Sequence, residues 1–154
     1  MIIVIRSLIF YVGMWLFTIP FTFVALCTFC LSPINRNKFI SLWAKFMLKW
    51  LQVTCNLTFT VSGIENIPSS PCIIFSKHQS AWETLALQKI FPPQVWVLKR
   101  ELLWLPFFGW GLAMTSPIAI DRGAGRKSLD QILTQGIDRI KKGFFVVIFP
   151  EGTR

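Results

Sequence analysis

The fold is decided by the stretch FFVVIFPEGTR at residues 144–154. Its first six residues are all apolar, which is typical of a strand buried on both faces of a parallel sheet. Similar short runs occur upstream, and the five predicted strands are Leu57–Val61, Cys72–Phe75, Val95–Leu98, Pro117–Ile120 and Phe144–Phe149. Helical segments alternate with them. Residues 57–154 are therefore predicted to form an α/β domain with a mostly parallel sheet and crossover helices.

Two helices are predicted between these strands. The first covers Ala81–Phe91 and is ended by Pro92-Pro93, because proline has no amide hydrogen with which to continue a helix. The second covers Arg126–Lys142, and its apolar residues recur at helical spacing as Leu129, Ile132, Leu133, Ile137 and Ile140. This stripe is typical of an amphipathic helix.

Residues 1–35 are predicted to anchor the chain in a membrane. No charged residue occurs between Arg6 and Arg36, and the apolar stretch at residues 8–31 exceeds the roughly 18 residues that indicate a membrane-spanning helix. It is also longer than the core of a signal peptide, and no cleavage site follows it. Pro20 interrupts the helical hydrogen bonding, so a single kinked span and a helical hairpin within one leaflet both remain open.

Residues 36–56 are predicted to form a basic amphipathic helix. Lys38, Lys45 and Lys49 fall on one side, and the other side carries Phe39, Trp43, Phe46, Met47, Trp50 and Leu51. Such a helix lies at a lipid interface, or it packs its apolar side on the protein core and leaves the lysines in solvent. The excess of basic residues after the apolar segment places the rest of the chain on the cytoplasmic side of the membrane.

The composition narrows the range of partners. Apolar residues make up 53% of the 154 residues, and the formal net charge is +9, which suits an anionic membrane surface. Nucleic acid is not expected as a partner, because the aromatic residues lie in apolar runs rather than among lysines. The four cysteines show no disulfide or zinc pattern, and a single histidine excludes a multi-histidine site, so no metal is expected.

Reactive side chains follow the carboxyl ends of the later predicted strands, where open α/β sheets bind their ligands. His78 follows one strand, and Ser80 and Glu83 have the spacing of a capping box, in which Glu83 reaches back to the Ser80 amide. That geometry also brings Glu83 toward His78. An imidazole held by a carboxylate is a suitable general base for an alcohol that attacks a carbonyl.

Cationic side chains in the same loops are candidates for an anion site. They are Arg122 and Arg154, with Lys77, Lys99 and Arg100, and Gly152 lets backbone amides approach the same anion. The segment at residues 102–110 is too apolar for an ordinary loop. It is interpreted either as core or as a surface for acyl chains or lipid, with the contact residues Trp104, Phe107, Phe108 and Trp110.

Three blocks of the sequence resemble the motifs of the glycerolipid acyltransferases. HQSAWE at residues 78–83 resembles their H-x4-D/E motif, with Glu83 at the position where Asp is commoner. IDR at residues 120–122 is similar to their second block, and FPEGTR at residues 149–154 is similar to their F-P-E-G-T-R block. The blocks keep the order and spacing of the family from about residue 57 to residue 154.

The resemblance implies an activity, a site and co-substrates. The activity is transfer of a fatty acyl group from acyl-CoA or acyl carrier protein to the 2-hydroxyl of 1-acyl-sn-glycerol 3-phosphate (lysophosphatidic acid), which gives phosphatidic acid in phospholipid biosynthesis. His78 is then the base, Glu83 orients it, and the acceptor phosphate is bound by Arg122, Glu151, Gly152, Thr153 and Arg154. No cofactor beyond the acyl donor is implied. The implied location is the bacterial inner membrane, with the catalytic domain on the cytoplasmic face.

Members of this family continue beyond the F-P-E-G-T-R block. The resemblance therefore predicts that the α/β domain is truncated at its C-terminus, and that these 154 residues alone have low stability and little or no activity. Two alternative functions stay open. One is an acyltransferase that uses another lysolipid as acceptor, and the other is a non-catalytic membrane module that binds anionic lipid.

Overall fold

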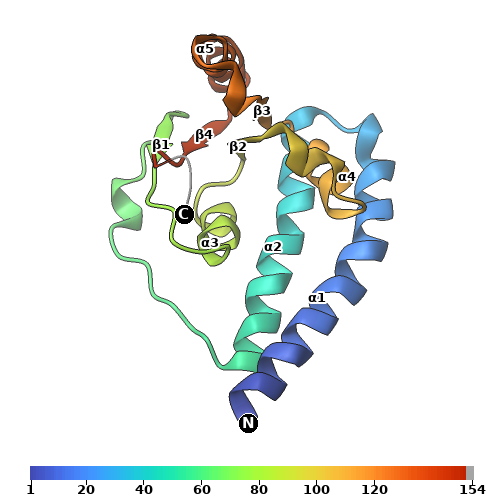
Figure 1. Ribbon diagram of the computed structural model, residues 1–154. Helices are drawn as coiled ribbons and strands as arrows, with labels where there is room; N and C mark the ends of the chain where they lie inside the picture. Colours follow the sequence, from blue (N-terminus) through green and yellow to red (C-terminus); the bar gives the residue numbers. More distant parts are fainter. Residues whose placement is uncertain (152–154) are drawn as a thin grey trace.

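The computed structural model describes residues 1–151, with only the backbone described at Arg122. Over these residues a pair of long N-terminal helices stands beside an α/β unit (Figure 1). The α-helices are α1 (Ile2–Cys27), α2 (Pro33–Cys55), α3 (Trp82–Ile90), α4 (Phe108–Ala113) and α5 (Arg126–Lys141). The strands are β1 (Ile73–Phe75), β2 (Gln94–Lys99), β3 (Ile118–Ile120) and β4 (Phe145–Ile148). The short 3-10 helices are η1 (Thr28–Cys30), η2 (Ile64–Asn66), η3 (Arg100–Trp104) and η4 (Arg122–Ala124).

Within the described part of the chain, the four strands form one parallel sheet in the order β1-β4-β2-β3. In β4, Val146 pairs with Ile73 on one side and with Val95 on the other. α3 connects β1 to β2, η3 and α4 connect β2 to β3, and α5 connects β3 to β4. The predicted α/β class, parallel sheet and crossover helices are confirmed, and the bounds of these four strands lie within one residue of those predicted.

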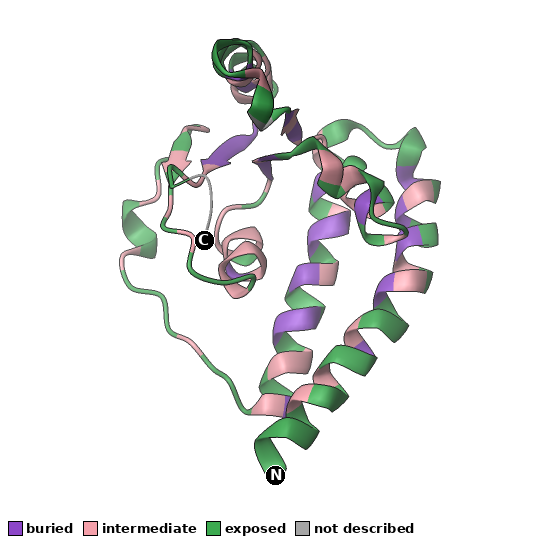
Figure 2. Ribbon diagram, viewed as in Figure 1, coloured by how far each residue is buried: buried purple, intermediate pink, exposed green. Residues whose placement is uncertain are grey.

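The sheet is covered on both faces, as its apolar strands require (Figure 2). On one face, α5 packs against a buried cluster that consists of Val95, Ile118, Ile120, Phe144 and Val146. On the other face, α3 and α4 contribute Leu87 and Leu112 to a cluster around Trp96, Leu98 and Val147. Successive residues of β4 therefore enter different cores, which explains why the run at residues 144–149 has no polar position.

The prediction of a strand over Leu57–Val61 is wrong. These residues pair with no strand that the structure describes, and both Leu57 and Val61 are exposed. α2 ends at Cys55, and Asn56 caps it with a φ of 55°, after which the chain continues as a connection. Within that connection the Phe59 ring packs edge-on against Trp82 of α3, with centroids 5.0 Å apart. One ring of this segment thus packs on a helix, and the segment does not extend the sheet.

The predicted helix over Arg126–Lys142 is present as α5, but its apolar residues do not form one buried stripe. Ile132 and Ile140 pack on the sheet, whereas the side chains that are more than half exposed are Leu129, Leu133 and Ile137. The buried residues of α5 are the small ones, Ser128 and Gly136. The Ser128 hydroxyl donates to the carbonyl of Asp121, the residue after β3, and Gly136 faces Ile118 of β3.

α1 and α2 form an antiparallel hairpin (Figure 1). Pro33 starts α2 at its first position, and the Ser32 hydroxyl accepts the Asn35 amide as a cap. Gly13 of α1 lies directly against Trp50 of α2, since an added Cβ would lie 2.5 Å from Nε1 of Trp50. Among the described residues, Ile2–Cys30 is the one segment long and apolar enough to cross a membrane, with a mean hydropathy of 2.1.

α2 is also attached to the α/β unit. It packs against α3, and the Arg36 guanidinium donates to the Met114 carbonyl (2.8 Å) and to the Ser116 hydroxyl (3.3 Å). The three lysines of the predicted basic face, Lys38, Lys45 and Lys49, are exposed. Of the predicted apolar face, Met47 is buried in the protein while Phe46 is 45% exposed. This helix therefore packs on the protein and still leaves a basic surface open.

Candidate active site

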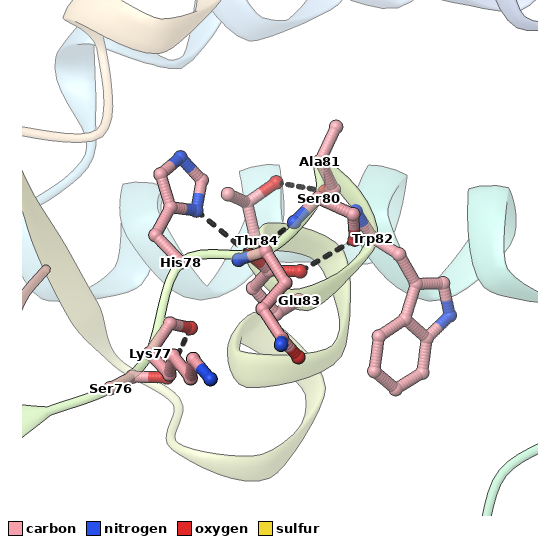
Figure 3. Close-up of polar contacts among 9 residues, drawn as sticks. Ser76, Lys77, His78, Ser80, Ala81, Trp82, Glu83 and Thr84 are labelled. Carbon is pink, nitrogen blue, oxygen red and sulfur yellow. Dashed lines mark hydrogen bonds and ion pairs between the residues drawn. The ribbon is translucent and has the colours of Figure 1, made fainter. Parts of the chain in front are cut away.

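His78 and Glu83 are in contact, as the spacing of the motif predicts. His78 lies in the loop after β1, Glu83 lies in the first turn of α3, and the His78 Nδ1 is 2.8 Å from the Glu83 Oε1 (Figure 3). The Gln79 and Ser80 amides donate to the same carboxylate oxygen at 2.7 and 2.8 Å. The Ser80 hydroxyl donates to the other oxygen, Oε2, at 2.6 Å. Both carboxylate oxygens are therefore held in place.

These contacts show that Glu83 both takes part in the capping box and holds the histidine. Its Oε1 accepts the Ser80 amide, as a capping box requires, and also contacts the imidazole. The Ser80 hydroxyl accepts the Trp82 amide at 3.1 Å, although the residue that caps α3 is Ala81. Glu83 thus fixes the start of α3 and the ring of His78 with one carboxylate.

The charge of Glu83 follows from these bonds. Burial opposes its ionisation, but hydrogen bonds from the Ser80 side chain and backbone, together with the one from His78, lower its pKa from 4.5 to about 2. The carboxylate is therefore ionised at neutral pH and can only accept. The proton in the contact with His78 must then lie on Nδ1, which leaves Nε2 as the basic nitrogen of the neutral ring.

An aromatic stack reaches the histidine from the sheet. The ring of His78 lies 4.1 Å from the ring of Phe149, at an interplanar angle of 21°. The ring of Phe149 also stacks on the ring of Trp96 of β2, with centroids 5.6 Å apart and an interplanar angle of 11°. The sequence analysis missed this stack, although Phe149 is two residues beyond Val147 and so lies on the same side of the sheet.

A mostly apolar pocket of about 330 Å³ has His78 in its wall. Its other walls come from both N-terminal helices, from α3, from β2, from α4 and from Phe149 after β4. α1 contributes Met14, Thr18, Phe21, Thr22 and Ala25, and α2 contributes Ile40 and Trp43. The Trp43 indole donates to the Thr18 hydroxyl at 3.2 Å, which ties the two helices together beside the pocket. A segment predicted as an anchor is thus also part of this cavity.

The four aromatic residues predicted to contact acyl chains or membrane occupy different places. Phe108 lines the pocket, next to Trp43, with ring centroids 6.2 Å apart. Trp104 and Trp110 are 71% and 42% exposed and do not line it. The ring of Phe107 lies against Phe23 of α1. The structure therefore places one of them in the cavity and two on the surface.

The predicted phosphate site is described only in part. The backbone of Arg122 opens η4 directly after β3, and Glu151 is exposed in the turn after β4. Both positions follow carboxyl ends of parallel strands, as His78 does. The side chain of Arg122 and the residues Gly152, Thr153 and Arg154 lie outside the described part of the structure.

The fold and the site together define an α/β protein with a histidine and carboxylate pair beside an apolar pocket, joined to an apolar helical hairpin. A family model described as Acyltransferase matches residues 58–154. The chain belongs to this acyltransferase family.

Two similar proteins have the same name, which states their activity. The chain is 48% identical over 132 residues to the 1-acyl-sn-glycerol-3-phosphate acyltransferase of Pseudomonas aeruginosa, which covers 82% of this chain and 51% of that protein. It is 32% identical over 119 residues to the protein of the same name from Saccharomyces cerevisiae, which covers 70% of this chain and 39% of that protein. The chain thus spans about half or less of the length of these relatives.

A solved structure shares the fold. The crystal structure of the 1-acyl-sn-glycerophosphate (LPA) acyltransferase, PlsC, from Thermotoga maritima matches with a TM-score of 0.75 at 23% identity. The match covers 99% of this chain, so it includes the helical hairpin as well as the sheet, and 61% of that chain.

Proposed function

We propose that this chain carries the catalytic site of a 1-acyl-sn-glycerol-3-phosphate acyltransferase. The observation that supports the proposal most strongly is the His78–Glu83 pair, 2.8 Å apart, in the wall of an apolar pocket of about 330 Å³. The donor is acyl-CoA or acyl carrier protein, the acceptor is lysophosphatidic acid, and the product is phosphatidic acid. The names of the relatives from Pseudomonas and Saccharomyces point to the same reaction.

The chemistry starts at Nε2 of His78. This nitrogen removes the proton of the 2-hydroxyl group while the hydroxyl oxygen attacks the thioester carbonyl carbon. The tetrahedral intermediate collapses, the carbon–sulfur bond breaks, and the thiolate takes the proton from the imidazolium. Glu83 holds Nδ1 throughout, and its negative charge stabilises the imidazolium that forms between the two steps.

The pocket is proposed to hold an acyl chain. Its size lies in the range of ligand sites, and its walls are mostly apolar side chains with His78 at one position. Phe108 belongs to this wall, whereas the exposed rings of Trp104 and Trp110 are proposed to contact lipid. The acceptor phosphate is proposed to bind Arg122, Glu151, Gly152, Thr153 and Arg154, beyond the ends of β3 and β4.

The hairpin is proposed to lie in one leaflet rather than to cross the membrane. α2 runs beside α1, from the stacked rings of Phe21 and Phe39 to the bond between the Arg6 Nε and the Thr54 carbonyl, 2.7 Å long. A membrane-spanning α1 would carry α2 and the exposed Lys45 into the hydrocarbon, where a lysine is costly. In one leaflet, the exposed apolar residues of α1 meet acyl chains and the lysines meet anionic headgroups. The α/β unit then lies on the same side, proposed to be the cytoplasmic face of the bacterial inner membrane.

The test uses membranes from cells that express the gene encoding this chain. They are incubated with lysophosphatidic acid and labelled acyl-CoA or acyl carrier protein, and phosphatidic acid is measured for wild type and His78→Ala. Product that disappears with the histidine supports both the reaction and the base. If wild type acylates only another lysolipid, the acceptor is wrong. If lipid is bound and no lysolipid is acylated, the catalytic proposal fails and a lipid-binding module remains.

A further inference from the structure

The stack on His78 is built by the register of the sheet. Trp96 pairs with Val147 across β2 and β4, and Phe149 follows Val147 by two residues on the same face. β1 pairs with the other side of β4, with Phe75 opposite Ile148, so the loop that carries His78 leaves the sheet beside Phe149. Three neighbouring strands therefore place three rings in one stacked column: His78 after β1, Phe149 after β4 and Trp96 in β2.

The stacked rings restrict a motion of the imidazole that the contact with Glu83 leaves possible. The contact between Nδ1 and Glu83 fixes one direction in the plane of the imidazole, but by itself it does not fix the tilt of the ring about that direction. The face of Phe149, 4.1 Å away and 21° from parallel, restricts this tilt. Trp96 is only 5% exposed, so Phe149 in turn rests on a buried ring.

We propose that Phe149 is a positioning residue for His78, and that Trp96 supports it from the core. The inference rests on the proposed function, because the tilt of the ring matters to turnover only where His78 is the base. Base catalysis requires Nε2 to point at the hydroxyl group, and a tilted ring loses this alignment without losing the bond to Glu83. Phe149 also lines the proposed acyl-chain pocket, but in the role proposed here it acts through the orientation of His78.

The experiment compares Phe149→Leu, which keeps an apolar side chain without a ring, with Phe149→Tyr, which keeps the ring. Phe145→Leu is the matched control, because it removes a ring from the same face of β4 at a position that packs on Phe91 instead. The expected result for Phe149→Leu is a loss of kcat of about 10-fold. The KM of both substrates is expected to change little, because leucine keeps this part of the pocket wall apolar. Phe149→Tyr and Phe145→Leu are expected to keep the wild-type kcat.

A spectroscopic measurement separates positioning from folding. His78 is the only histidine in the chain, so its ring protons can be followed by NMR in detergent micelles. The ring current of Phe149 is expected to shift them upfield in wild type and in Phe149→Tyr, and this shift is expected to disappear in Phe149→Leu. Unchanged ring shifts and kcat in Phe149→Leu overturn the inference, provided that wild type is active. An inactive wild type, or an active His78→Ala, overturns the proposed function instead.

Discussion

The side-chain amide of Asn37 bonds to the backbone of Gln94 as a neighbouring strand would. Its Nδ2 donates to the Gln94 carbonyl at 2.8 Å, and its Oδ1 accepts the Gln94 amide at 3.3 Å. The same Nδ2 also reaches the Thr115 carbonyl at 3.0 Å. Asn37 is 2% exposed and Gln94 is 1% exposed, so these are bonds between buried groups that join α2 to the start of β2.

Asn37→Ala is therefore expected to lower the free energy of unfolding by about 2–3 kcal/mol, because buried backbone groups lose their partners. Chemical unfolding in detergent, followed by circular dichroism, measures the change. Asn35→Ala is the control, since Asn35 is exposed on the same helix. Equal stability of the two variants would contradict the stabilising role of the bonds from Asn37 to Gln94 and Thr115.

Gly13→Ala is expected to loosen the hairpin. The new methyl group would meet the Trp50 indole, whose Nε1 donates to the Phe10 carbonyl at 3.3 Å and cannot move without losing that bond. A lower midpoint of thermal unfolding, by several degrees, is expected from about 1–3 kcal/mol of overpacking. Gly111→Ala adds the same methyl group at ordinary contact distance, 3.5 Å from the Thr22 hydroxyl, and should leave the midpoint nearly unchanged.

Glu83 gives the site a defined dependence on acid. Its pKa of about 2 in the folded protein lies below its ordinary value of 4.5, so ionised Glu83 stabilises the fold fully above pH 4.5. This stability declines as the pH falls from about 4.5 toward 2. The difference in unfolding free energy between wild type and Glu83→Gln, measured at a series of pH values, should shrink over that interval. A difference that stays constant from pH 6 to pH 3 would rule out this role.

The same variant tests catalysis at neutral pH. Glu83→Gln removes the charge that holds and stabilises the imidazolium, so kcat is expected to fall by about 100-fold or more. Glu83→Asp restores the commoner acid of the family and the charge, and should retain more activity than Glu83→Gln. The opposite order would show that the amide geometry, and not the charge, matters.

The lysines of α2 are expected to control membrane affinity. Each exposed lysine near an anionic surface contributes about 1 kcal/mol, so changing Lys38, Lys45 and Lys49 to Gln should weaken binding to anionic vesicles by about 100-fold. Lys127, Lys141 and Lys142 are exposed in or next to α5, and changing them removes the same charge away from the hairpin. Vesicle sedimentation compares the two triple variants. Equal losses would mean that net charge, rather than the basic face of α2, governs binding.

The chain's own cysteines test whether the hairpin lies in one leaflet. Cys55 lies at the end of the hairpin opposite the tip, where its Sγ contacts the Arg6 carbonyl at 3.7 Å. An α1 that crossed the membrane would carry Cys55 to the outer face, whereas a hairpin within the cytoplasmic leaflet exposes no thiol there. An impermeant thiol reagent added to intact spheroplasts is therefore expected to leave the protein unlabelled, and labelling that disappears in Cys55→Ser would contradict the one-leaflet proposal.

Local spacing predicted much of this molecule. The parallel strands follow from apolar runs, and the contact between His78 and Glu83 follows from a capping box that needs only one helical turn. The strand over Leu57–Val61 was predicted wrongly, because an apolar run looks the same whether it joins a sheet or forms a connection that packs one ring on a helix. The bond of Asn37 to Gln94 and the stack of Phe149 on His78 depend on segments 57 and 71 residues apart, and no local period encodes them.

Because the hairpin forms part of the pocket wall, its N-terminal segment cannot be replaced by an unrelated membrane anchor without changing the pocket. Met14, Thr18 and Phe21 would all be lost if residues 1–35 were replaced by an unrelated membrane anchor of equal hydrophobicity. Such a chimera would still reach the bilayer, but its cavity would be open on one side. In this chain the same helices bind lipid and form part of the pocket wall beside the histidine. Neither function can therefore be redesigned without changing the other.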